Sequence, residues 1–89
     1  MTIRWTEPAV DSIERIHTYV EAESNQDKAA EIVNSLILAV DRLQITPMMG
    51  RGGTDKGTRE LVRPPYIIVY KIVEDVVNVI NIVHGSQRV

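Results

Sequence analysis

Two histidines are the side chains of this sequence most able to move a proton. His84 follows the last long apolar run, and a histidine can act as a general acid or base because its pKa lies near neutral pH. The alternative for His84 is a strand-end residue that contacts solvent. His17 falls near the apolar stripe of a helical segment, where a partly buried histidine without a chemical role is expected. With two histidines and no cysteine, we expect no zinc site, no cysteine nucleophile and no cofactor.

Basic side chains are the second group with chemical potential. Guanidinium groups suit phosphates and carboxylates because their planar N–H fork pairs with two oxygens. This favours contact with a nucleic acid or an acidic protein, and a solubilising rim with local ion pairs is the alternative. The glycine-rich stretch lacks the GxxxxGK[ST] spacing, which excludes a nucleotide-binding P-loop. The basic residues that could gather at one end of a sheet are Arg51, Lys56, Arg59, Arg63 and Arg88.

Length and composition predict a single soluble globular domain over residues 1–89. The chain has a mass of 10.0 kDa, with 44% apolar and 25% charged residues. Residues 1–41 hold eight acids and three bases, whereas residues 42–89 hold four acids and seven bases. This asymmetry could give one face that meets an anionic partner. No apolar run is long enough for a membrane span and no signal peptide is evident, so we expect a cytoplasmic protein.

Two helices follow a short N-terminal strand in the predicted order of elements. Residues 2–6 alternate as a strand, and Thr6 is the expected N-cap of a helix over 7–24. Apolar residues at helical spacing predict a second helix over 26–45, which Pro47 stops. The two helices form an αα-hairpin.

Three strands close the chain after a flexible loop over 47–57. The alternating segments 58–63, 66–73 and 76–84 predict a meander, with a tight turn at Glu74-Asp75. The order is therefore β-α-α-β-β-β. We expect an α+β fold in which one antiparallel sheet carries the helical hairpin.

Both faces of this sheet are mostly apolar. Alternation places Ile82 and His84 on one face of the last strand, and Val77, Val79 and Val83 on the other. Two helices can cover only one face, so the other face would present an apolar patch, and such patches usually mark a protein interface. The sequence therefore predicts a tightly bound partner, which is either a second copy or another chain.

A known family shares these motifs in this order and spacing. They are L-x-x-x-P-x-x-G-R over 43–51, R-E-L-V over 59–62, Y-x-I-V-Y over 66–70 and the strand that ends in His84-Gly85. Over nearly its whole length the chain resembles the RelE/ParE superfamily of bacterial type II toxin–antitoxin toxins. The resemblance implies one of two activities. RelE-like members are ribosome-dependent endoribonucleases that cut mRNA, whereas ParE-like members poison DNA gyrase without chemistry of their own and stabilise plasmids.

One residue of the central strand favours the ParE-like branch. RelE-like nucleases typically carry an arginine where this chain has Ile67, and an aliphatic side chain cannot stabilise a phosphorane or a leaving oxygen. A C-terminal catalytic tyrosine is also absent from the tail GSQRV. The favoured interpretation is a gyrase-binding toxin that is not an enzyme. In the alternative, an endoribonuclease would bind phosphate with Arg59 and Arg63 and use His84 as its acid or base.

The resemblance also implies a protein that neutralises the toxin. This partner would be a ParD-like antitoxin that wraps the toxin in a hetero-oligomer and covers the apolar face. Contact with the antitoxin or the target is expected of Arg51, Arg59, Arg63, Tyr70, His84 and Arg88.

Overall fold

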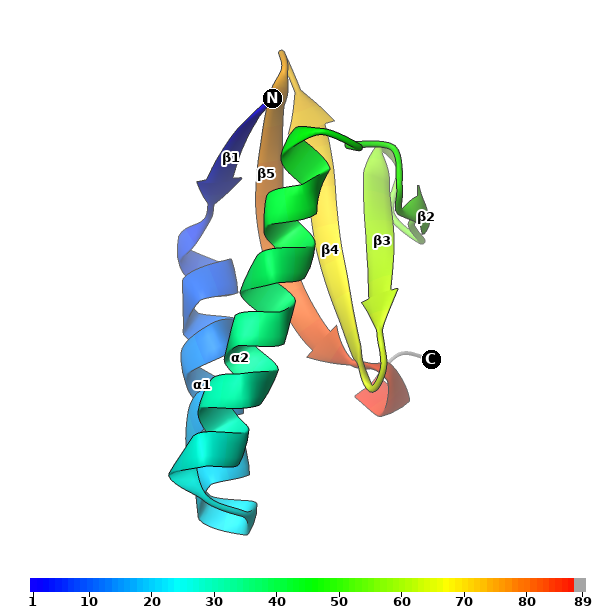
Figure 1. Ribbon diagram of the computed structural model, residues 1–89. Coiled ribbons are helices and arrows are strands. Elements are labelled where there is room, and N and C mark those ends of the chain that lie inside the picture. The colour runs from blue at the N-terminus through cyan, green and yellow to red at the C-terminus, as the bar shows by residue number, and fades with distance from the viewer. Residues whose placement is uncertain (88–89) are drawn as a thin grey trace.

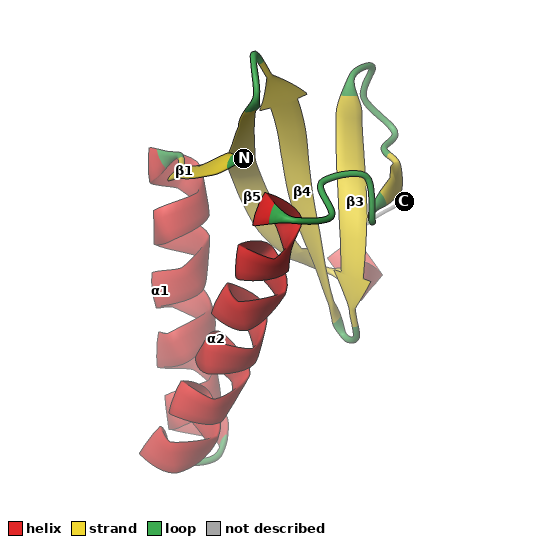
Figure 2. Ribbon diagram, turned by 45° about the horizontal axis from the view of Figure 1, so that its top comes forward, coloured by secondary structure: helices red, strands yellow, loops and turns green. Residues whose placement is uncertain are grey.

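Two layers make up the protein: a five-stranded sheet and a helical hairpin that covers one of its faces (Figures 1 and 2). The computed structural model describes residues 1–87, so the predicted contact residue Arg88 lies outside the described residues. Neither helix in this range is long and apolar enough to cross a membrane. The elements are β1 (Thr2–Trp5), α1 (Glu7–Glu23), α2 (Gln26–Asp41), a 3₁₀ turn (Arg42–Gln44), β2 (Arg51–Gly52), β3 (Thr58–Arg63), β4 (Tyr66–Val73), β5 (Val76–His84) and a second 3₁₀ turn (Gly85–Gln87).

The predicted α+β class and the order of strand, two helices and meander are confirmed. Two features of the sheet differ from the prediction. β1 runs parallel to β5, so the sheet is mixed rather than antiparallel. Arg51–Gly52 adds the short edge strand β2 beside β3, giving the strand order β1-β5-β4-β3-β2. Alternating apolar residues predict strands, but they carry no information on the direction or identity of the neighbouring strand.

The ends of the helices show how the hairpin is fixed. Asn25 caps α2, because its side chain accepts a hydrogen bond from the backbone N–H of Lys28 at 2.8 Å. α2 ends at Asp41, earlier than expected, since the chain then tightens into a 3₁₀ turn. Thr6 precedes α1 but makes no side-chain cap. Its hydroxyl instead donates to the carbonyl of Val79 at 2.7 Å, which ties the start of α1 to β5.

β4 and β5 are joined by the turn at Glu74 and Asp75. Both residues have positive φ, of 48° and 64°, and Val73 pairs with Val76 on either side of them. Two successive left-handed residues give the turn whose twist matches that of the flanking strands.

A β-bulge interrupts this hairpin further along. Tyr70 pairs with Val79 but Val69 pairs with Asn81, so Ile80 is an extra residue in β5. A bulge of this kind breaks the simple alternation of side chains along its strand.

The bulge changes which β5 side chains face the helices. Val77 and Val79 are fully buried before the bulge, and Ile82 beyond it belongs to the same core at 5% exposure. The prediction that placed Val77, Val79 and Val83 on one face, opposite Ile82 and His84, is therefore wrong. It assumed an unbroken alternation, which the extra residue removes.

The sheet face opposite the helices, here called the outer face, is only partly exposed. Val62 and Val73 on this face are 37% and 46% exposed, whereas Ile67 is 7% exposed. The helix-covered face holds the core, which includes Leu36 and Leu43 from the hairpin side.

Candidate partner-binding surface

Tyr70 of β4 holds the loop that follows the helical hairpin. Its side chain is fully buried, and its hydroxyl donates to the carbonyl of Pro47 at 2.7 Å and accepts from the N–H of Gly50 at 2.9 Å. A Cβ atom at Gly50 would lie 2.6 Å from that hydroxyl and 2.8 Å from the carbonyl oxygen of Glu60, so the close approach needs glycine. Tyr70 therefore supports the loop from inside. Its burial corrects the expectation that it contacts a partner.

Arg59 of β3 is tied to the same loop. Its Nη2 donates to the carbonyls of Met48 at 3.0 Å and Gly50 at 2.5 Å. Its buried Nε has no hydrogen-bond partner among the described residues. Arg59 pairs with Tyr70 across β3 and β4, so both side chains lie on the helix side of the sheet. The geometry gives Arg59 a structural role, with its guanidinium already engaged by backbone carbonyls.

Arg51 of β2 lies on the outer face and neutralises a buried acid. Its Nη2 is 3.2 Å from Oε1 of Glu60, and the two side chains are 62% and 3% exposed. A carboxylate removed from water needs such a compensating charge. Because most of the Arg51 side chain remains exposed, it can also meet an acidic group of a partner.

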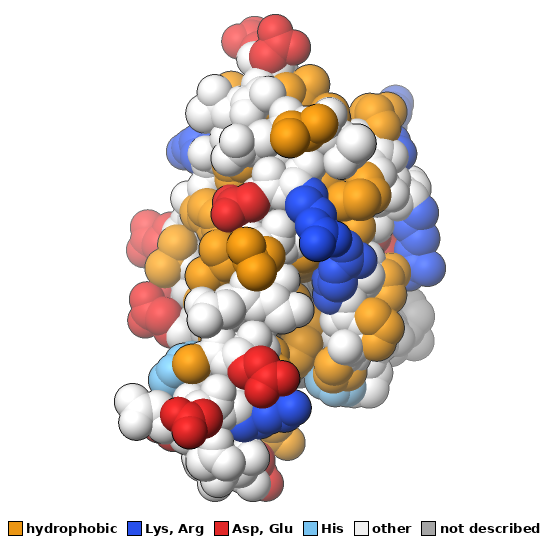
Figure 3. All heavy atoms as spheres, viewed as in Figure 1, with side chains coloured by type: hydrophobic (Ala, Val, Ile, Leu, Met, Phe, Trp, Pro, Cys, Tyr) orange, Lys and Arg blue, Asp and Glu red, His pale blue; other side chains and the backbone are white. Residues whose placement is uncertain are grey.

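Arg63 stands at the end of β3 beside α2. Its Nη1 donates to the carbonyl of Val62 at 3.1 Å, at the edge of the sheet that β2 does not cover. It also lines a small groove of about 200 Å³ with Glu31 and Ser35 of α2. On this side of the molecule, Lys and Arg side chains form a stretch beside α2, and acidic side chains lie over both helices (Figure 3).

His84 ends β5 and is oriented by two neighbours. Its ring meets the ring of Tyr66 edge to face, with centroids 5.6 Å apart and an interplanar angle of 83°. The N–H of Ser86 donates to Nδ1 of His84 at 3.1 Å, and the Ser86 hydroxyl lies 2.7 Å from the same nitrogen. Because Nδ1 accepts this backbone hydrogen bond, the neutral imidazole carries its proton on Nε2.

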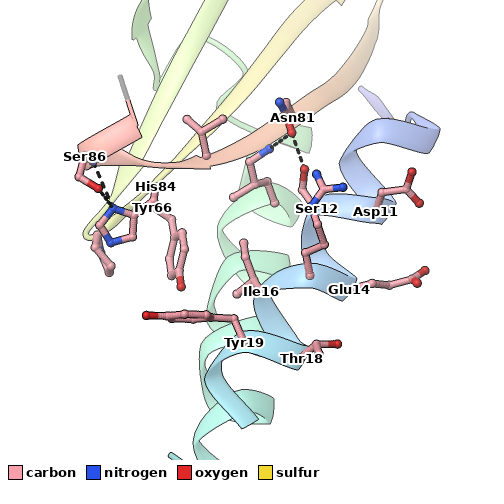
Figure 4. Close-up of a pocket in the computed structure, with 14 residues that line it drawn as sticks. Asp11, Ser12, Glu14, Ile16, Thr18, Tyr19, Tyr66, Asn81, His84 and Ser86 are labelled. Carbon is pink, nitrogen blue, oxygen red and sulfur yellow. Dashed lines mark hydrogen bonds between the residues drawn. The ribbon is translucent and has the colours of Figure 1, made fainter. Parts of the chain in front are cut away.

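A larger groove of about 1300 Å³ opens between α1 and the second half of β5 (Figure 4). Its lining includes Ile16 and Tyr19 from α1, Tyr66 from β4, and Ile82 and His84 from β5. Tyr66 is 8% exposed, and its hydroxyl has no hydrogen-bond partner within residues 1–87. Burial, and to a lesser extent the neighbouring Tyr19, raises the pKa of Tyr66 above its ordinary value. The groove therefore contains a neutral phenol group that is available to a ligand.

The predicted site residues are only partly brought together. Cross-strand pairing places Arg63, Tyr66 and His84 in one row across β3, β4 and β5. Arg59 lies at the opposite end of β3, and Arg51 lies on the other face of the sheet. The set proposed for an endoribonuclease, Arg59 with Arg63 and His84, therefore does not form one compact cluster.

Several residues of the larger groove were missed in the sequence. The side-chain oxygen of Asn81 accepts from the N–H of Ile82 at 2.9 Å and from the hydroxyl of buried Ser12 on α1. Tyr66 lies in an alternating strand segment, where no local pattern distinguishes a hydroxyl that reaches a groove. Within residues 1–87, no three His, Asp or Glu side chains are grouped so that they could hold a metal ion.

Comparison with known proteins supports the same family as the motifs. A model of the ParE toxin of the type II toxin–antitoxin system parDE matches residues 3–89. A Sinorhizobium fredii protein named "Putative toxin Y4kP" is 41% identical over 88 residues, which cover 97% of this chain and 90% of that protein.

Solved structures share the fold. A chain of the chromosomal ParDE system from P. aeruginosa superposes with a TM-score of 0.87 at 22% identity, covering 94% of this chain and 95% of that one. A chain of the RelBE2 toxin–antitoxin complex from Mycobacterium tuberculosis gives a TM-score of 0.68 at 17% identity, covering 93% and 95%. The matched family model and the close relative together show that this chain belongs to the ParE family of type II toxin–antitoxin toxins.

Proposed function

We propose that this toxin acts in the cytoplasm by binding DNA gyrase, without chemistry of its own, and that a ParD-like antitoxin neutralises it. The observation that carries the proposal is the aliphatic Ile67 at the strand position where RelE-like nucleases have an arginine. Ile67 is 7% exposed and pairs with Val62 and Val83, so that part of the outer face is apolar. An apolar surface favours association with a protein over stabilisation of a phosphate transition state.

The engagement of Arg59 also supports a binding toxin. Its Nη2 already bonds two loop carbonyls, so moving this guanidinium to a phosphate would release the loop. A catalytic group is most effective when it is preorganised toward the reacting atoms rather than toward the fold.

An endoribonuclease is the second candidate, and one observation favours it. Arg63 and His84 lie at the same end of the sheet, on either side of Tyr66, and His84 lines the larger groove. In that case Arg63 would hold a phosphate and His84 would transfer a proton.

The test is a pair of assays with purified toxin. The first measures inhibition of gyrase-catalysed supercoiling of relaxed plasmid, and the second measures cleavage of mRNA on ribosomes. The proposal expects inhibition in the first assay and no cleavage in the second. Inducing the toxin in a bacterial culture should correspondingly stop DNA synthesis before protein synthesis.

His84→Ala separates a contact residue from a catalytic one. Loss of one contact hydrogen bond weakens binding by about tenfold, whereas loss of a general acid or base costs about 100-fold or more. We expect at most the smaller loss in gyrase inhibition. Cleavage of mRNA by the wild type that falls at least 100-fold in this variant would replace the gyrase proposal with the endoribonuclease.

For the antitoxin, we propose an acidic, partly apolar segment that contacts Arg51 and Arg63. Both arginines keep exposed surface, and apolar residues lie close to each of them along β3. Arg63→Glu should weaken the purified toxin–antitoxin complex at low salt more than at high salt, because salt screens exposed charges. Equal weakening at both salt concentrations would exclude a charge contact at Arg63.

A further inference from the structure

The larger groove runs along a part of β5 that lacks a neighbouring strand on one side. β1 pairs with β5 only as far as Val79, and residues 81–84 pair with β4 alone among the described strands. The hydroxyl of Thr6 lies within hydrogen-bonding distance of the carbonyls of Val79 and Ile80, where β1 ends. Beyond this point the groove is bounded by α1 on one side and by the open edge of β5 on the other.

The carbonyl of Ile82 points to this open edge. The N–H of Gly85 donates to the carbonyl of Pro65 at 2.7 Å, which makes Pro65 and Gly85 a hydrogen-bonded pair between β4 and β5. Such pairs recur at every second residue of an antiparallel ladder, so Ile67 and Val83 form the next one. Ile82 belongs to the adjacent pair, with Ile68, which is not hydrogen-bonded, so Ile82 directs its backbone groups away from β4. Its N–H is taken by the side chain of Asn81, and its carbonyl is left for an added strand.

The Tyr66 hydroxyl and the Arg15 guanidinium on α1 are among the groove's hydrogen-bond donors that have no ion pair or hydrogen bond within residues 1–87. Both can donate to a carboxylate. The nearby acids Asp11 and Glu14 extend away from Tyr66 and His84 (Figure 4).

We propose that this groove binds an extended peptide segment of a protein partner that carries an Asp or Glu side chain. The segment adds to the open edge of β5 and donates a backbone N–H to the carbonyl of Ile82. Its carboxylate accepts from the Tyr66 hydroxyl and the Arg15 guanidinium, and an apolar neighbour packs on Ile16. This site is separate from Arg51 and Arg63, and it does not depend on gyrase being the target.

The experiment titrates the isotope-labelled full chain with a capped peptide of sequence Val-Glu-Val-Glu-Val and follows backbone amide shifts by NMR. Two matched peptides serve as controls: one replaces both glutamates by lysine, and one replaces the central valine by proline. We expect saturable shifts at Ile82, Tyr66 and Tyr19 with the glutamate peptide, and none with either control. Tyr66→Phe and Arg15→Gln should each weaken binding by roughly threefold to tenfold.

Equal binding of the lysine or proline peptide would overturn the proposal, as would shifts confined to Arg51 and Arg63. Tyr66→Phe should unfold at the same urea concentration as the wild type, because its hydroxyl makes no bond within the described chain. A variant that stays folded and binds as tightly as the wild type would also contradict the proposal.

Discussion

At the scale of single residues, the loop after the helical hairpin depends on one glycine and one hydroxyl group. Gly50→Ala would push a Cβ atom against the Tyr70 hydroxyl and a backbone carbonyl. Overpacking of this kind costs about 1–3 kcal/mol, so we expect a lower urea midpoint. Gly52→Ala is the matched control, because a Cβ atom there meets nothing within 4 Å. Equal stability of the two variants would show that the loop relaxes without cost.

The Tyr70 hydroxyl provides an independent measurement of the same anchor. Tyr70→Phe leaves the carbonyl of Pro47 and the N–H of Gly50 without this partner, and each buried unsatisfied group costs about 1–3 kcal/mol. Urea unfolding should show the loss. Tyr66→Phe removes the same atom from the same type of strand residue without breaking a bond, so it serves as the reference. If the two variants are equally stable, the hydroxyl of Tyr70 does not hold the loop.

At the scale of elements, the spacing of apolar residues predicted the helices and strands but not how the strands pair with one another. The period of β5 changes at Ile80 because of the bulge, and a sequence pattern gives no sign of an extra residue in an apolar strand. The two-residue strand at Arg51–Gly52 was also missed, since it is defined by pairing with Arg59 and Glu60 rather than by its own composition. Tyr70 was expected to contact a partner because it belongs to the Y-x-I-V-Y motif. A motif identifies a residue but does not show whether its side chain is buried, as that of Tyr70 is.

The bulge has its own stabilising contact, which can be tested. Asn81→Ala removes the acceptor for the Ile82 N–H and for the buried Ser12 hydroxyl, so we expect a loss of about 1–3 kcal/mol in urea unfolding. Asn78→Ala is the comparison in the same strand, where the amide makes longer contacts of 3.3 Å or more. It should cost about 0.5 kcal/mol or less. A double variant with Ser12→Ala should be less destabilised than the sum of its single changes.

At the scale of the whole molecule, apolar side chains remain exposed in several places, among them the end of α2 with the loop after it and the outer face of the sheet. Leu38 and Ile45, at the end of α2 and in the loop that follows, are 62% and 87% exposed. Val62 and Val73 lie on the outer face at 37% and 46%. Large exposed apolar areas are characteristic of chains that bind partners, so both places are available to an antitoxin or a target.

Dye binding measures how much each place contributes in the isolated toxin. Leu38→Gln with Ile45→Gln should lower the fluorescence of a hydrophobic dye more than Val62→Thr with Val73→Thr, because the first pair exposes the larger fraction of its side chains. Light scattering on the same samples gives the mass. If the wild type self-associates, the double variant that breaks the contact should shift toward monomer. Unchanged fluorescence and mass in both double variants would mean that neither place forms a continuous apolar patch, and the argument for a wrapping partner would then depend on Arg51 and Arg63 alone.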